Sequence, residues 1–181
     1  ESKILVKECF SPLNIQLLFS DKWEEVELAK LFCNVYRDYN FSFSNLLLRI
    51  TNELSLDASK VIDLVSTNYK RMPLLKTGPV SGPCLTKDSL ILSNSISDNT
   101  SKIILENARK INKDVIDFAK ADIRYIANKL ETSKLLFIGL TFKNNPFTTD
   151  TRESHSLELI RSLKNNFQCL IYDPYTDKDS Q

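Results

Sequence analysis

Glycine is scarce in this 181-residue chain, and its scarcity limits what the chain can bind. There are three glycines, Gly78, Gly82 and Gly139, against an average usage of about 7%. The phosphate-binding fingerprint G-x-G-x-x-G of dinucleotide-binding folds needs three glycines within six residues. No such cluster exists here, so we expect that this chain does not hold NAD by that device.

Metal-binding residues and long apolar runs are also sparse. A single histidine, His155, and the absence of any C-x-x-C spacing argue against a zinc site, and we predict no bound metal. Scattered cysteines in a lysine-rich chain without a signal peptide are typical of a reducing cytoplasm. No run of eighteen apolar residues is present, so we expect no membrane span. The four cysteines are Cys9, Cys33, Cys84 and Cys169.

Neither sign of charge dominates. The 24 Lys and Arg residues nearly balance the 23 Asp and Glu residues, which leaves a formal net charge of +1. The two signs are interleaved, with no basic stripe, so we expect no nucleic-acid partner. The chain opens on Glu1 and its only methionine is Met72, and we therefore expect it to be a piece of a longer protein.

Hydrophobic periodicity predicts helices over the first two thirds of the chain. Apolar residues recur at helical spacing over 22–54, where Asp21 could cap the helix, and shorter helices are predicted over 57–65 and 84–92. The longest periodic stretch, 101–131, predicts a connecting helix of about 45 Å at 1.5 Å per residue. On the first long helix we expect these residues to face the core: Trp23, the aromatic run 36–43, Leu47 and Ile50.

The period changes after residue 132. The apolar runs 135–139 and 169–172 are typical of buried parallel strands, and a helix from Arg152 to about Lys164, capped by Thr149 or Asp150, is predicted between them. This order is one βαβ unit, so the fold class predicted is α followed by α/β. We expect residues 1–20 to be the tail of a preceding domain, 21–132 a helical domain, and 133–181 the start of a Rossmann-like doubly wound domain.

The stretch TGPVSGPCLTKD, residues 77–88, is the strongest candidate for chemistry. A turn rich in glycine and proline running into an apolar helix places Cys84 at a helix N-terminus, where free N–H groups and the macrodipole favour a thiolate. If the helix starts near Pro83, then Cys84 and Asp88 at i, i+4 share one face. A nucleophile beside a carboxylate suits covalent catalysis. Spacing alone leaves open a buried structural cysteine.

Lys30 and Asn34 are also spaced i, i+4, on the first long helix. Pointing into one pocket, the lysine could hold an oxyanion and the asparagine could orient a water. The alternative is a solvated helix face.

Lys143 and Arg152 flank the predicted strand-to-helix loop, and two cations near a helix N-terminus suit a diphosphate. Arg152 could instead pair with Glu153 or Glu158. We expect His155, one turn into that helix, to lie at the surface.

Four stretches of the chain resemble motifs of the UDP-glucose/GDP-mannose dehydrogenase family, and they occur along the chain in the same order as in that family. Residues 77–88 are similar to its active-site loop, approximately G-x-G-G-x-C-x-P-K-D, and residues 26–34 (VELAKLFCN) to its A-E-x-x-K-x-x-x-N. Residues 139–154 hold GLTFK and DTRES, as in its G-L-x-F-K-x-x-x-x-D-x-R-E-S, and residues 172–174 match its Y-D-P. The four motifs run from residue 26 to residue 174.

The resemblance implies an NAD-dependent UDP-sugar 6-dehydrogenase that serves polysaccharide precursor synthesis. It implies that Cys84 attacks the aldehyde at the sixth carbon of the sugar to form a thiohemiacetal, which gives hydride to NAD and becomes a thioester. Hydrolysis then releases a uronic acid. By the same resemblance Lys30 stabilises the oxyanion, and Asn34 with Asp88 positions and activates water.

Substrate contacts and assembly are implied in the same way. Gly82 and the motif lysine Lys87 would lie at the substrate, although Lys87 could equally support the loop by its charge. Arg71 stands where relatives place an arginine that reaches the sugar nucleotide across a homodimer, which the helical domain would form. The NAD-binding domain is expected outside this chain.

Several positions depart from the family pattern. Pro79 and Ser81 replace preferred glycines, Thr86 replaces a proline, and Leu46 replaces the glutamate of S-F-x-N-E at residues 42–46. These changes put the sugar in doubt more than the reaction. They also leave a second hypothesis open, a non-catalytic dimerisation module derived from this family.

Overall fold

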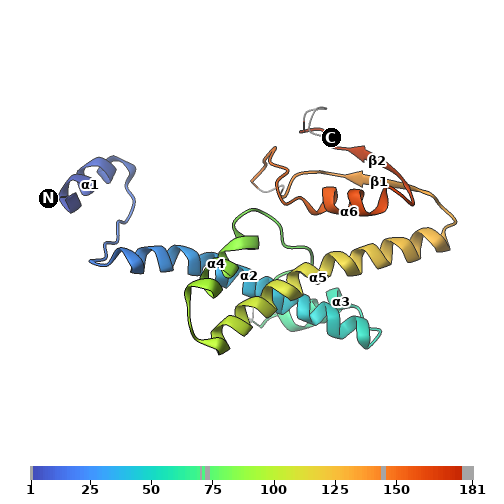
Figure 1. The fold of residues 1–181 in the computed structure, drawn as a ribbon, viewed down its shortest axis with the longest axis horizontal. Helices are drawn as coiled ribbons and strands as arrows, with labels where there is room; N and C mark the ends of the chain where they lie inside the picture. Colours follow the sequence, from blue (N-terminus) through green and yellow to red (C-terminus); the bar gives the residue numbers. More distant parts are fainter. Residues whose placement is uncertain (1, 70, 72–73, 144–145, 177–181) are drawn as a thin grey trace.

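The computed structural model describes residues 2–69, 71, 74–143 and 146–176, and this part of the chain is mostly helical (Figure 1). The predicted order, a helical part followed by a strand, a helix and a strand, is confirmed. The elements are α1 (Ser2–Phe10), a 3-10 turn (Ser11–Leu13), α2 (Trp23–Glu53), α3 (Ala58–Ser66), α4 (Leu85–Ser95), α5 (Asn99–Lys129), β1 (Lys134–Ile138), α6 (His155–Leu163) and β2 (Gln168–Tyr172).

Helices α2, α4 and α5 pack on one another and form the body of the helical part (Figure 1). Both α2 and α5 are 31 residues long. Their shared apolar core is small: Val35 of α2, Leu92 of α4 and Leu105 of α5 are buried together, with Ile96 against them. Such a small core leaves much of this junction to be held by polar contacts.

The inward face of α2 is polar, which contradicts the predicted core side. Six of its seven buried residues are polar, and only Val35 is apolar. Of the residues expected inside, Trp23 is 66% exposed and Phe43 is 50% exposed, and Ile50 is also exposed. Helical periodicity separates two faces of a helix but does not say which one a neighbouring element covers. The polar buried residues are Asn34, Asp38, Ser42, Ser44, Asn45 and Thr51.

The start of α2 also differs from the prediction. Lys22 is the N-cap residue and makes no side-chain cap, so Asp21 does not cap this helix. The carboxylate of Asp21 instead pairs with Lys3 at 2.5 Å. The predicted starts at residues 57 and 101 are close to those observed, because Asp57 and Asp98 accept hydrogen bonds from the first turns of α3 and α5.

Strands β1 and β2 form a two-stranded parallel sheet, with α6 in the connection between them. Helix α6 begins at His155 rather than at Arg152, because the hydroxyl of Ser154 accepts a hydrogen bond from the Leu157 amide at 3.4 Å. The predicted caps, Thr149 and Asp150, were therefore wrong. One face of the sheet is open, since Ile138 is 73% exposed, and the prediction of fully buried strands was wrong there.

Candidate active site

Cys84 lies immediately before α4 and its side chain is exposed. Its carbonyl oxygen accepts a hydrogen bond from the Asp88 amide at 3.0 Å, so the predicted spacing of one helical turn between these two residues is observed. Exposure of the thiol contradicts the alternative of a buried structural cysteine. The position leaves the sulfur accessible to a reagent or a substrate.

The turn before Cys84 requires glycine. Gly82 has a φ of +100°, which side-chain-bearing residues rarely adopt, and a Cβ added there would lie 3.1 Å from the ring of Phe142. The hydroxyl of Thr86 donates to the Gly82 carbonyl at 3.1 Å. The hydroxyl of Ser81 donates to the Phe142 carbonyl at 3.4 Å. The contacts of Ser81 and Gly82 with Phe142 bring the loop after β1 against the loop that carries Cys84.

Asp88 is buried and held by two donors. The side-chain amide of Asn34 donates to one carboxylate oxygen at 2.6 Å, and the ammonium of Lys87 contacts the other at 2.8 Å. Burial alone would raise the pKa of Asp88, but the hydrogen bonds from Lys87 and Asn34, with the charges of Lys87 and Lys30, outweigh it and lower the pKa. Asp88 is therefore an ionised, oriented carboxylate one turn from Cys84.

Two cations lie within electrostatic reach of the Cys84 thiol. Pairing with Asp88 is the main cause that raises the pKa of Lys87, and the charge of a Cys84 thiolate adds to it. Pairing with Asp150 is likewise the main cause that raises the pKa of Arg152, and Cys84 again contributes. The loop that precedes α6 therefore carries its arginine within electrostatic reach of the thiol.

Arg152 pairs with Asp150, and not with Glu153 or Glu158 as the alternative interpretation had it. The guanidinium contacts the carboxylate at 2.7 Å and lowers the pKa of Asp150 to about 2, with a smaller contribution from the charge of Lys143. The ammonium of Lys143 lies 5.3 Å from the centre of the Phe142 ring, the same ring that meets Gly82. Both predicted diphosphate-binding cations thus lie on the loop that faces Gly82.

Arg71 and His155 lie away from the hydrogen bonds that surround Asp88. Arg71 is exposed and lines a hollow with Tyr36, Asn40 and Phe41 of α2, and within the described residues it shares no hydrogen bond with Cys84. His155 was expected at the surface, but its side chain is only 19% exposed and lies 3.6 Å from Glu158.

Sequence reasoning missed a buried polar network next to this site. Asp38, Asn45, Ser89 and Asn112 are each at most 2% exposed and are joined by hydrogen bonds. A signal was present in the sequence, because residues 34, 38, 42 and 45 are all polar and follow one helical stripe.

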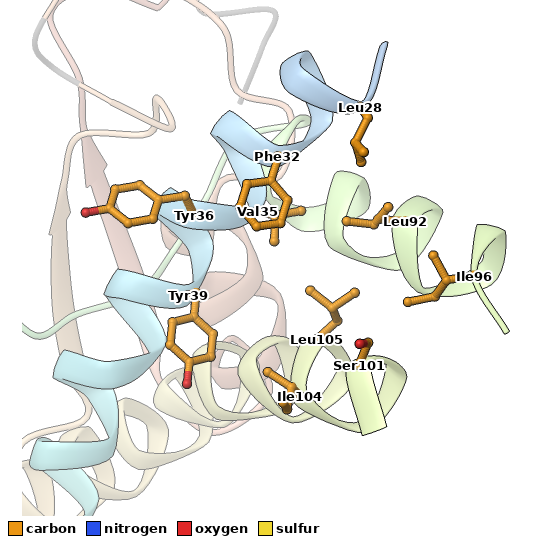
Figure 2. A pocket seen from close by; sticks show the side chains of 10 residues that line it. All are labelled: Leu28, Phe32, Val35, Tyr36, Tyr39, Leu92, Ile96, Ser101, Ile104 and Leu105. Atoms are coloured by element: carbon orange, nitrogen blue, oxygen red, sulfur yellow. The ribbon is translucent and has the colours of Figure 1, made fainter. Parts of the chain in front are cut away.

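An apolar groove of about 430 Å³ lies between α2, α4 and α5. Figure 2 shows side chains from all three helices around this hollow. Val35, Leu92 and Leu105 are buried residues in its lining, whereas Phe32 is 56% exposed. The full lining is Leu28, Phe32, Val35, Tyr36, Tyr39, Leu92, Ile96, Ser101, Ile104 and Leu105.

The described residues offer neither a membrane-spanning helix nor a metal-binding cluster. None of the helices in this part of the chain is both long and apolar enough to cross a membrane. Within the same residues, His, Cys, Asp and Glu side chains form no group of three or more that could hold a metal ion.

Comparison with known proteins points to one family. The family model described as the central domain of the UDP-glucose/GDP-mannose dehydrogenase family matches residues 24–114, half of the chain. The UDP-N-acetyl-D-mannosamine dehydrogenase of Pyrococcus horikoshii is 30% identical over 156 residues, which are 82% of this chain and 36% of that protein. The GDP-mannose 6-dehydrogenase of Azotobacter vinelandii is 29% identical over 81% of this chain and 34% of its own length.

Solved structures agree with the sequence comparison. The structure of the Pyrococcus horikoshii UDP-D-ManNAc dehydrogenase aligns with a TM-score of 0.71 at 28% identity, covering 83% of this chain and 36% of that one. A UDP-glucose dehydrogenase from Pyrobaculum islandicum aligns with a TM-score of 0.77 at 23% identity, over 96% of this chain and 40% of its own, and shows the fold alone.

The region matched by the family model contains the predicted catalytic residues. The chain spans about a third of the length of the curated relatives it matches. The matched residues 24–114 include Lys30, Asn34, Cys84 and Asp88. The chain belongs to the UDP-glucose/GDP-mannose dehydrogenase family.

Proposed function

We propose that this chain carries the covalent chemistry of a nucleotide-sugar 6-dehydrogenase, with Cys84 as the nucleophile. The observation that carries the proposal is the 2.6 Å hydrogen bond from Asn34 to the buried carboxylate of Asp88, one helical turn from an exposed cysteine. An ionised carboxylate and an amide held together beside a thiol are the parts that thioester hydrolysis needs.

The first step that we propose at Cys84 is addition to the aldehyde formed by oxidation of the sugar's primary alcohol. The Cys84 thiolate forms a C–S bond to the aldehyde carbon at the sixth position of the sugar, and the carbonyl electron pair moves to the oxygen. Lys30 stabilises the resulting oxyanion, in keeping with the reach of its charge to Asp88.

The last step we propose is hydrolysis of a thioester at Cys84. Asn34 and Asp88 orient a water toward the thioester carbon, the C–S bond breaks, and the products are a uronic acid and the free thiol. Because the pKa of Asp88 is lowered, its carboxylate is a weak base. We therefore assign it mainly the orientation and electrostatic activation of the water.

Two oxidations are needed: the hexose alcohol becomes the aldehyde before the addition, and the thiohemiacetal becomes the thioester after it. Each gives one hydride to an acceptor, which we propose to be NAD, as the family resemblance implies. The described residues do not fit that cofactor. Their one strand-to-helix connection, residues 139–154, contains a single glycine, Gly139, whereas close approach of a backbone to a dinucleotide needs several. We assign no part of the hydride transfer to this chain's residues.

The proposed substrate class is a nucleoside diphosphate hexose, as in the names of the curated relatives. Lys143 and Arg152 would bind the diphosphate, in support of which both lie on the loop that faces Gly82. Gly82, whose Cβ side is filled by the Phe142 ring, would shape the loop that borders the sugar, and Lys87 would add positive charge at the edge of the substrate. UDP-glucose, UDP-N-acetylmannosamine and GDP-mannose are distinguished by which of them slows alkylation of Cys84.

We also propose that β1, α6 and β2 begin a doubly wound nucleotide-sugar-binding domain after residue 132. The parallel strands support this, as does the hydrogen bond from the Leu140 amide to Asp173 at 2.6 Å, which joins the carboxyl ends of the two strands. Doubly wound sheets are covered on both faces, and the exposed side chains of Leu136 and Ile138 mark the face that remains to be covered.

A second copy of the chain is the proposed occupant of the apolar groove. Helix α2 contributes both to the hollow, through Val35, and to the projecting apolar side chains around it, through Phe32 and Tyr36 (Figure 2). A twofold symmetric interface must be self-complementary, which requires a hollow and a projection on the same surface, and this surface has both. We infer that the helical part forms a homodimer here. In that dimer Arg71, in the hollow beside Tyr36, could reach toward the other copy's site.

The direct test of the proposed chemistry replaces the nucleophile. In a preparation that reduces NAD with a nucleotide sugar, Cys84→Ser is expected to abolish net NADH formation. The control is Cys33→Ser on α2, because Cys33 is exposed as Cys84 is, and this surface substitution is expected to leave NADH formation within about twofold. Undiminished turnover by Cys84→Ser would contradict the proposal that Cys84 is the nucleophile.

A non-catalytic dimerisation module is the second candidate, and the groove is the observation that favours it. The two candidates differ in the reactivity of Cys84. The module predicts that iodoacetamide at pH 7 alkylates Cys84 no faster than the exposed Cys9 and Cys33. The enzyme predicts a Cys84 that reacts far faster than both.

A further inference from the structure

The loop that carries Cys84 is held at its start by a side chain of α2. Asn45 is fully buried, and its side-chain amide makes two hydrogen bonds to the backbone of a single residue. Its oxygen accepts from the Gly78 amide at 2.8 Å, and its nitrogen donates to the Gly78 carbonyl at 3.0 Å. Two bonds to a single residue fix the orientation of the chain as well as its position.

A second α2 side chain holds the other end of the same segment. The hydroxyl of Ser89, the residue after Asp88, donates to a carboxylate oxygen of Asp38 at 2.9 Å. Asp38 is fully buried, and its other oxygen accepts from Arg109 and, at 2.7 Å, from the Asn112 amide. The residues from Gly78 to Ser89, including Cys84, are therefore anchored to α2 at both ends.

The two anchors are themselves joined through α5. The Asn112 oxygen accepts from the Asn45 amide at 2.9 Å. The Asn112 nitrogen donates to the Asp38 carboxylate and, at 2.9 Å, to its backbone carbonyl. Asn45, Asn112 and Asp38 thus form one continuous buried chain of hydrogen bonds. In a low-dielectric interior such fully satisfied networks are directional and resist small displacements.

We propose that Asn45 and Asp38 are positioning residues that hold Cys84 at a fixed place relative to its neighbours. The same helix face carries Asn34, which contacts Asp88, so one rigid element positions both the loop and the group that faces the thiol. An apolar core would stabilise the junction without fixing direction, because hydrophobic contacts are non-directional. The inference rests on the proposed function, in which Cys84 is the nucleophile.

The test measures the thiol and needs no substrate. Iodoacetamide alkylation of Cys84 and of Cys33 is followed in the same sample by peptide mass spectrometry, and the ratio of the two rate constants is compared between variants. Asn45→Ala is expected to lower that ratio at least threefold at pH 7, because the loop no longer holds the thiol at the N-terminus of α4, which favours a thiolate. The difference is expected to shrink at pH 10, where an ordinary thiol is fully ionised.

A matched control and a milder variant complete the design. Thr51→Val removes a buried hydroxyl of the same helix whose hydrogen bonds, among the described residues, go to the carbonyls of Leu47 and Leu48, and it is expected to leave the ratio unchanged. Should Asn45→Ala fail to fold, Ser89→Ala, which removes only the hydroxyl that donates to Asp38 at the other end of the segment, is expected to lower the ratio in the same direction, and an unchanged ratio in that variant would likewise overturn the inference.

Failure of the positioning role is distinct from failure of the proposed function. An unchanged alkylation ratio in a folded Asn45 variant, even with lowered thermal stability, would mean a purely structural network and overturn the inference. That result could coexist with Cys84→Ser abolishing NADH formation. Conversely, a lowered ratio would support the positioning role even if the chain oxidised no sugar.

Discussion

The two faces of α2 reverse the usual arrangement of an amphipathic helix. Its buried face carries mainly amides, hydroxyls and a carboxylate, and its exposed face carries large apolar side chains such as Phe32 and Tyr36. In most globular proteins the apolar stripe of a helix faces the core. The difference indicates two separate demands on α2: its polar face holds the cysteine loop through directional hydrogen bonds, and its apolar face is the surface on which we propose that a second copy packs.

Burial of the polar face is tolerated because its groups are paired. Unpaired buried polar groups cost free energy, whereas hydrogen-bonded ones are close to neutral. Asp38 accepts from three side chains, and the Asn45 amide uses both of its donors and its acceptor. Among the buried side chains of α2 in the described residues, only the hydroxyl of Ser44 lacks a partner.

Removing the central carboxylate is the strongest way to break the polar face. Asp38→Ala leaves the Arg109 guanidinium, which is 12% exposed, without its counter-ion. We expect a loss of about 3 kcal/mol or more in the free energy of unfolding, as for other buried pairs that lose one member. Urea denaturation at fixed protein concentration measures it. The half-exposed pair Arg49–Asp114 is the control, and Asp114→Ala is expected to cost about 1 kcal/mol or less. Equal losses in the two variants would contradict the assignment of a special role to Asp38.

A charge on the apolar face should affect association rather than folding. Phe32 is 56% exposed and lines the groove, so Phe32→Glu is expected to leave the single chain folded. We expect its self-association constant to fall more than tenfold, about 1.4 kcal/mol, because a carboxylate would have to be desolvated in the interface. Sedimentation velocity over a dilution series measures this constant. The same change at Tyr125, exposed on α5 and outside the groove, is the control, and equal effects at both positions would argue against the groove.

Acidification should weaken the polar face where it meets the site. The pKa of Asp88 is lowered in the folded chain relative to its ordinary value near 3.9, so its ionised form stabilises the fold above that value and the contribution is lost as pH falls below it. Asp88→Asn, which has nearly the same shape, is therefore expected to show a smaller drop in melting temperature between pH 5 and pH 2 than the natural chain. Asp117→Asn, at a 75% exposed side chain, should not. A parallel drop in both variants would show that other carboxylates control acid stability.

The sequence predicted the elements better than their environments. Helix periods and the strand–helix–strand order followed from local pattern, and the motif spacing placed Cys84 one turn from Asp88. The contact between Asn34 and Asp88, 54 positions apart, depends on how α2 and α4 pack, which no local pattern specifies. The same limitation explains why Phe43 was assigned to the core: the sequence showed an apolar face but not what covers it.

The smallest expected effect tests whether polarity alone explains the buried face. Ser44 is fully buried on α2, and its hydroxyl has no hydrogen-bond partner, in contrast to Asn45 beside it. Ser44→Ala removes an unsatisfied group and improves helix propensity, so we expect the free energy of unfolding to rise by about 0.5 kcal/mol. Because alanine leaves the neighbouring Asn45 bonds intact, the alkylation ratio of Cys84 to Cys33 should not change. A loss of stability above about 1 kcal/mol would instead mean that the hydroxyl belongs to the network, and the polar face would then act as one cooperative unit rather than through the named pairs.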